Sequence, residues 1–152
     1  MTFYPSRLLA AVTFAASILV SAVQAQHIST NSENVAIDGY GTVAYFTEAR
    51  PVQGSPEFQT EWQDATWQFS SVEHQAMFEA NPEKYAPRFG GFCAGVMSLE
   101  GQPSPPDPRL WRIVDGNLFL ATKQIGLDYL DEDAESKLAG AEANWKALTA
   151  TN

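Results

Sequence analysis

Two short stretches in which apolar and polar residues alternate constrain the fold of this chain more than any other feature. Residues 58–70 turn back at Asp64, and residues 110–121 turn back at Asp115-Gly116. The apolar side of the first stretch is aromatic and consists of Phe58, Trp62, Trp67 and Phe69. Alternation with a period of two is typical of half-buried strands, and Asp-Gly between apolar arms is a strong hairpin signal. The sequence therefore predicts two antiparallel β-hairpins.

Helical signals surround the hairpins. Ser70 or Ser71 can cap a helix after the first hairpin, and Asn81-Pro82 ends that helix and begins another turn. Residues 122–152 are helical by composition, with a break in their acidic part. The last helix has apolar residues at helical spacing, namely Leu138, Ala141, Trp145 and Leu148. We therefore expect a small, single α+β domain with two antiparallel β-hairpins, short helices around a Gly-Gly-Phe-Cys-Ala turn and a C-terminal helix.

The first 25 residues have the three-part layout of a secretory signal peptide. A short start contains one basic residue, Arg7, and is followed by an apolar stretch at residues 8–20. Val23-Gln24-Ala25 then forms a small-x-small cleavage signal. The uncharged run extends from Leu8 to about His27, so an uncleaved membrane anchor stays open as an alternative. The pattern favours cleavage, and no later segment is apolar enough to cross a bilayer.

The expected organisation places the protein in the periplasm or outside the cell. We expect three segments: a signal peptide at residues 1–25, a flexible lead at residues 26–34 and one folded domain at residues 35–148. Loss of the signal peptide would remove Arg7 alone among the charged residues, which leaves 8 basic and 18 acidic residues and a net charge of −10. Such a surface repels phosphate backbones, so nucleic acid is excluded as a partner.

The most unusual part of the chain is the pair Gly90-Gly91, which is followed by Phe92 and the single cysteine, Cys93. Paired glycines indicate a tight turn or a close approach of another part of the backbone. One cysteine cannot form an internal disulfide. In an oxidising compartment, an unpaired thiol is buried, bound to a metal, reactive, or paired with another chain.

A copper(I) site is one interpretation of this cysteine. Thiolate, thioether and imidazole ligands together suit copper(I), so Cys93, Met97 and His74 are the candidate metal ligands. Two plainer interpretations remain open. In the first, Cys93 is a small buried apolar residue. In the second, His74 is a capping or solvent-facing residue of an amphipathic helix.

Signatures of common enzyme classes do not occur in the sequence. It contains no glycine-rich phosphate loop, no serine nucleophile elbow and no His-Glu metalloprotease motif. A thiol-dependent enzyme or redox partner that uses Cys93 would need a lowered thiol pKa. The sequence therefore favours a function without catalysis.

Several segments together resemble the YHS domain in its secreted bacterial form. The main one is TWQFSSVEHQAMFEANPEKYAP at residues 66–87, followed by GGFCA at residues 90–94. GYGTVAYF, WRIVDGNLFLA and ANW resemble further pieces of that family, and the resemblance extends from about Val35 to Trp145. It implies a small α+β unit related to treble-clef-like metal-binding modules.

The resemblance also implies that the family's metal site has changed here. Three cysteines bind the ion in metal-binding members, and Ala44, Ser70 and His74 occupy those positions in this chain. A serine hydroxyl is a poor ligand for a soft metal, and alanine is no ligand. The main expectation is a non-catalytic periplasmic protein that binds a transition metal, copper foremost, through Cys93. The alternative is a module for a small ligand or a protein partner, with a vacated metal site.

Overall fold

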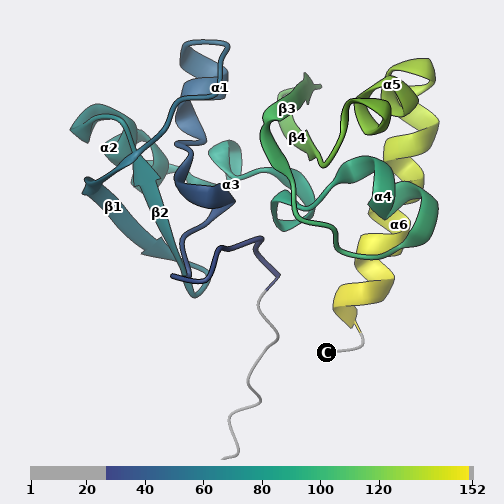
Figure 1. The fold of residues 1–152 in the computed structure, drawn as a ribbon, viewed down its shortest axis with the longest axis horizontal. Coiled ribbons are helices and arrows are strands. Elements are labelled where there is room, and N and C mark those ends of the chain that lie inside the picture. The colour runs from purple at the N-terminus through teal and green to yellow at the C-terminus, as the bar shows by residue number, and fades with distance from the viewer. Residues whose placement is uncertain (1–26, 151–152) are drawn as a thin grey trace, which may run out of the picture.

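The computed structural model describes residues 27–150, so the expected signal peptide lies outside the described residues (Figure 1). The first half contains η1 (Ile37–Gly39), α1 (Val43–Thr47), β1 (Ser55–Trp62), β2 (Ala65–Phe69), α2 (Val72–Ala80) and α3 (Pro82–Tyr85). The second half contains η2 (Arg88–Gly91), α4 (Ala94–Glu100), β3 (Asp107–Val114), β4 (Asn117–Ala121), α5 (Gln124–Glu132) and α6 (Ala134–Ala150). The small α+β domain with two antiparallel hairpins and a C-terminal helix is confirmed.

Both hairpins turn where the sequence predicts. Gln63 and Asp64 have positive φ values of 50° and 58° between β1 and β2. Asp115 and Gly116 have φ values of 50° and 75° between β3 and β4. Two central residues with positive φ are typical of the turns that match the twist of antiparallel strands. The register follows directly, because Trp62 pairs with Ala65 and Val114 pairs with Asn117.

Strand β4 lies between the two halves of the core. Leu118 and Leu120 belong to the aromatic cluster of the first half, around Trp67 and Phe78. Phe119, on the opposite face of the strand, belongs to a second cluster. Successive side chains of a strand point to opposite faces, so one strand can serve both clusters. Figure 1 shows the β1–β2 hairpin with α1 and α2 on one side, and α4, α5 and α6 on the other.

The helix starts and breaks have local causes. Ser71 precedes α2, and its hydroxyl accepts a hydrogen bond from the His74 backbone N–H at 3.2 Å. Asn81 similarly accepts from the Lys84 N–H at 3.3 Å, with Pro82 as the first residue of α3. These contacts satisfy N–H groups that have no partner inside the helix. Asp133 separates α5 from α6 and accepts from the Ser136 N–H. Across residues 27–150, we find no helix with the length and apolar character needed to span a membrane.

The segment predicted to be a flexible lead packs against the domain at residues 27–31, and residues 32–34 are exposed. Ile28 and Ser29 are buried, and the Ser29 N–H donates to the Gly90 carbonyl at 2.8 Å. A Cβ atom on Gly90 would lie 1.6 Å from the His27 carbonyl oxygen, and one on Gly91 would lie 2.2 Å from the Ile37 Cδ1. The structure shows both features proposed for the paired glycines, because they make these close approaches and also lie in a tight turn, η2, with φ values of 61° and 84°. The prediction of a flexible lead rested on the polarity of residues 26–34 alone, and the packing of Ile28 and Ser29 does not agree with it.

A buried phenol joins the two halves and leads to a pH-dependent prediction. The Tyr45 hydroxyl donates to the Pro108 carbonyl at 2.6 Å. Burial raises the pKa of Tyr45 well above its usual range, and nearby Tyr40 and Asp107 add to the shift. We expect Tyr45→Phe to lower the free energy of unfolding by about 1–3 kcal/mol at neutral pH, because the buried carbonyl loses its donor.

The same shift sets the response of stability to alkaline pH. The folded pKa exceeds the unfolded value of about 10. The stabilisation is therefore complete below that pH and is lost as the pH rises above it. Urea unfolding at neutral and alkaline pH should show a smaller alkaline loss in Tyr45→Phe than in the wild type. Tyr129→Phe, at a partly exposed residue of α5 that takes no part in this shift, is the control. An equal alkaline loss in all three proteins would contradict this assignment.

Candidate functional site

Cys93 lies at the start of α4 and is almost completely buried. Cys93 is 1% exposed, and it packs in an apolar cluster with Ala121 and Leu127. Its backbone N–H donates to the Ser104 carbonyl at 2.9 Å, and a β-bridge joins it to Leu120. These contacts fix the thiol between the α4 start, strand β4 and helix α5.

The structure does not bring the three predicted metal ligands together. Met97 is one turn after Cys93, but it packs in a different cluster, with Phe89 and Phe119. His74 lies in α2, beside the first hairpin, whereas α4 lies in the other half (Figure 1). Across the described residues, no group of three or more His, Cys, Asp and Glu side chains is placed to hold a metal ion.

His74 instead lies between α1 and α2 among oxygen atoms. Its Nδ1 is 3.4 Å from the Ser70 hydroxyl, and its Nε2 is 3.2 Å from the Thr47 hydroxyl. The Glu48 carboxylate is 3.9 Å from the same Nε2. Ser70 and His74, two of the three positions that the resemblance assigns to cysteines, are thus neighbours. The third, Ala44, is buried in α1. Hydroxyl oxygens are poor ligands for soft metals, so these side chains do not form a favourable copper(I) site.

A cavity of about 640 Å³ opens between α4, α5 and the loop before β3. We call it the α4–α5 groove, and its main apolar lining consists of Cys93, Val96, Leu99, Ile125, Gly126 and Tyr129. Leu99 and Ile125 are 64% and 75% exposed, the two highest values among the large apolar residues of the described chain. The buried residue Cys93 is therefore part of the wall of an open, largely apolar groove.

Two glycines bring α4 and α5 close together beside this groove. A Cβ atom on Gly95 would lie 3.1 Å from the Gly126 carbonyl oxygen, so a side chain there would separate the helices. A Cβ atom on Gly126 would lie 3.5 Å from both the Cys93 sulfur and the Ala121 Cβ, which is ordinary contact. Gly126 thus leaves room for one methyl group directly against the thiol.

This geometry makes Gly126→Ala a test of access to Cys93. The added methyl group should cover the sulfur and slow its alkylation by N-ethylmaleimide several-fold. The variant should also gain about 0.5–1 kcal/mol of stability, because alanine restricts the unfolded chain. Gly140→Ala in α6 is the matched control, since its Cβ atom would meet only the Ser98 hydroxyl, at 3.4 Å. Equal alkylation rates in both variants and the wild type would show that reagents do not reach the thiol past Gly126.

Sequence reasoning identified the cysteine but missed the groove around it. Leu99 and Ile125 were not selected, although each is a large apolar residue in a short helix whose buried face is formed by other residues. Glycines inside two helices, Gly95 and Gly126, were the available signal for close helix packing. Comparison of the chain with protein-family models, with curated proteins and with solved structures gives no match.

Proposed function

We propose that this chain is an exported, non-catalytic, YHS-like binding module that takes up a small, uncharged, mainly apolar molecule in the α4–α5 groove. The observation that carries the proposal is the groove itself, with Leu99 and Ile125 exposed beside it. Its volume of about 640 Å³ lies within the range of about 300–1,000 Å³ that is usual for small-molecule sites. Cys93 would supply a polarisable sulfur against the bound molecule.

The polar groups of the groove favour an uncharged ligand. Glu100 and Lys123 both line it, and their opposite charges leave no net charge. The Ser104 and Thr122 hydroxyls lie 2.9 Å apart, and the Thr122 hydroxyl also donates to the Pro105 carbonyl at 2.7 Å. The hydroxyl groups are thus already engaged, so apolar contact would supply most of the binding free energy.

Copper(I) binding through Cys93 has weaker support from the geometry. Met97 is the nearest thioether along the chain, but it packs in another cluster, and His74 makes its contacts in the other half. A single thiolate does not complete a copper(I) site, because two or more soft ligands are usual. Copper(I) is therefore used as a second probe, beside the apolar one, in the test of the groove.

The test uses N-phenyl-1-naphthylamine, an uncharged fluorescent apolar probe. We expect one probe molecule per chain, and we expect Leu99→Ser with Ile125→Ser to weaken its binding roughly tenfold or more, because both side chains lose apolar contact. Val72→Ser is the matched control, since Val72 is 57% exposed on α2, outside the groove. Binding by the double variant equal to that of the control would overturn the proposal.

Two further results would also overturn it. Dimerisation that depends on Leu99 and Ile125 would assign these residues to self-association. Stoichiometric copper(I) binding that is lost in Cys93→Ser, without any binding of the apolar probe, would assign the thiol to a metal site.

A further inference from the structure

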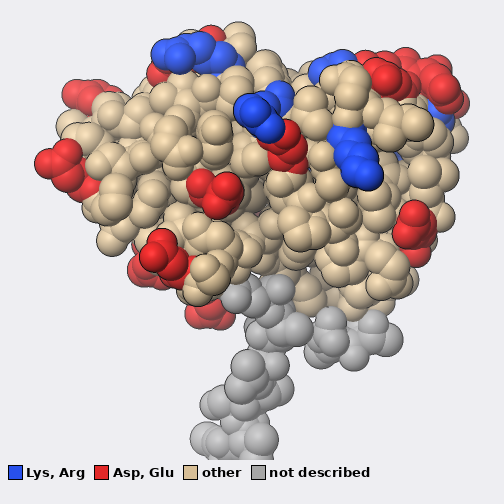
Figure 2. All heavy atoms as spheres, in the orientation of Figure 1, with Lys and Arg blue, Asp and Glu red and all other residues tan. Residues whose placement is uncertain are grey.

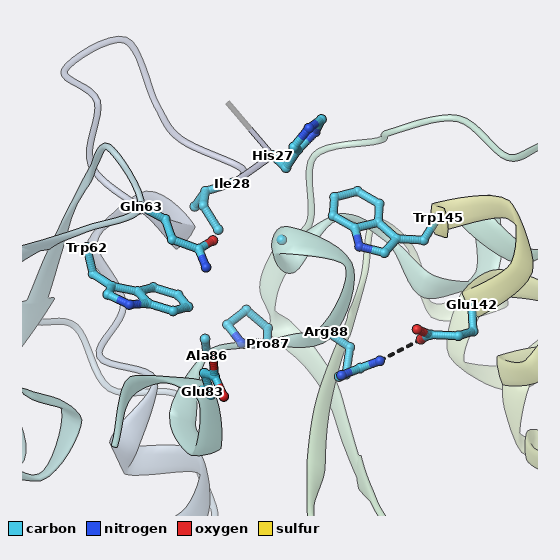
Figure 3. A pocket seen from close by; sticks show the side chains of 11 residues that line it. His27, Ile28, Trp62, Gln63, Glu83, Ala86, Pro87, Arg88, Glu142 and Trp145 are labelled. Atoms are coloured by element: carbon cyan, nitrogen blue, oxygen red, sulfur yellow. Dashed lines mark hydrogen bonds and ion pairs between the residues drawn. The ribbon is translucent and has the colours of Figure 1, made fainter. Parts of the chain in front are cut away.

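A second cavity, of about 450 Å³, lies where the two halves of the domain meet (Figure 3). We call it the Trp cleft, and the residues that the argument uses are Trp62, Gln63, Glu83, Arg88, Glu142 and Trp145. Figure 3 shows Trp62 and Gln63 on one side and Trp145 with Glu142 on the other, with Pro87 between them. None of these residues lines the α4–α5 groove, so the Trp cleft is a separate site.

Aromatic neighbours hold both indole rings in place. The Trp62 ring is 5.6 Å from Trp67 and 5.8 Å from Phe78, centre to centre, in edge-on arrangements. The Trp145 ring is 6.2 Å from Phe89 and 6.4 Å from Phe92. A ligand that contacts these indoles would therefore meet surfaces whose orientation is already fixed, which reduces the entropy cost of binding.

The charges of the Trp cleft leave one carboxylate without a cation. Arg88 and Glu142 form an ion pair at 2.6 Å, so their charges offset each other. Glu83 is an exposed residue of α3 that lines the cleft. Within residues 27–150 it has no ion-pair partner. The neighbouring Lys84 lies over the Tyr85 ring instead, 4.9 Å from its centre.

The overall charge of the protein has the same sign as that of Glu83. The whole chain has a formal net charge of −9. Figure 2 shows acidic side chains distributed over the visible face and gathered over α5 and the start of α6. An excess of one sign raises the local concentration of ligands with the opposite sign.

We propose that the Trp cleft binds an organic cation with an alkylated ammonium head, such as a quaternary ammonium group. The faces of tryptophan rings attract such cations, and indole is the best of the aromatic side chains for this contact. Glu83 supplies the compensating charge, and Gln63 offers an amide oxygen to the same cleft. An alkylated ammonium head suits the cleft better than a metal ion does. Its apolar methyl groups can pack against the indoles, and its positive charge can still be attracted to Glu83.

The test compares choline with 3,3-dimethylbutan-1-ol, which has the same shape but no charge. Titration calorimetry on the purified protein at low salt should show choline binding that is roughly tenfold or more stronger than that of the neutral alcohol. Glu83→Gln should weaken choline binding about five- to tenfold, because it removes the unpaired charge. Glu73→Gln, the same change at an exposed residue of α2 outside the cleft, should have less than about a twofold effect.

A further variant tests the role of the indole ring, and four outcomes would contradict the proposal. Trp145→Phe retains an aromatic ring and should weaken choline binding, with far-UV circular dichroism as the check of folding. Equal binding of choline and the alcohol, no choline binding, or equal effects of the two glutamate variants would each overturn the proposal. Binding of a neutral sugar in place of choline would also overturn it. The Leu99→Ser, Ile125→Ser protein should bind choline normally, which separates this site from the groove.

Discussion

Gly90→Ala is expected to lower the free energy of unfolding by about 3 kcal/mol or more, since it combines backbone strain with a steric clash. Gly90 has a φ of +61°, a conformation that alanine rarely adopts. The new Cβ atom would also lie 1.6 Å from the His27 carbonyl oxygen and 3.2 Å from the Ile28 Cα. Because both are backbone atoms, the N-terminal segment would have to move away, with loss of the Ser29–Gly90 hydrogen bond.

Gly116→Ala is the matched control for that measurement. Gly116 has a φ of +75°, but a Cβ atom there would have no heavy atom within 4 Å. This variant should lose only about 1–2 kcal/mol, from the backbone conformation alone. Urea unfolding followed by tryptophan fluorescence gives both values. Equal losses in the two variants would mean that residues 27–29 do not pack against Gly90 as the structure describes.

The second large effect is expected at the centre of the first core cluster. Trp67 is 1% exposed and stacks on Phe78 with ring centres 4.9 Å apart. Its indole N–H donates to the Trp62 carbonyl at 3.0 Å. Trp67→Ala should therefore lower the free energy of unfolding by about 3–5 kcal/mol, the usual cost of removing a large buried aromatic side chain.

Trp67→Phe separates the ring from its N–H group. Phenylalanine keeps an aromatic ring for Phe78 but has no donor for the Trp62 carbonyl, and it fills less space. We expect a loss of about 1–2 kcal/mol, well below that of the alanine variant. Thermal and urea unfolding should agree on this order. A loss below about 1 kcal/mol in Trp67→Ala would show that the cluster is not the tightly packed core described above.

Features that depend on neighbouring residues could be predicted from the sequence. The Asp115-Gly116 turn, the alternation in residues 58–70 and the caps at Ser71 and Asn81 all involve residues within a few positions of one another. The break at Asp133 belongs to the same group. Local backbone preferences and short-range hydrogen bonds determine these features, so the pattern of residue types is sufficient information.

Features that depend on distant residues could not be predicted in the same way. Cys93 and His74 are 19 positions apart, and nothing in that spacing tells whether the fold brings them together. The tight turn at the paired glycines is a local feature, but the approach of His27 and Ile37 to them depends on residues more than 50 positions away. The α4–α5 groove is equally non-local, because its walls come from two helices and a loop.

The packing of the N-terminal segment on Gly90 also determines when this segment can fold during synthesis. Ser29 precedes its hydrogen-bond partner Gly90 by about 60 residues, and chains grow at roughly 5–20 residues per second. Ile28 and Ser29 are therefore synthesised several seconds before residue 90. During that interval the beginning of the domain is still accessible. We therefore expect residues 27–29 to stay accessible to proteases until Gly90 has been synthesised and the segment can pack against it.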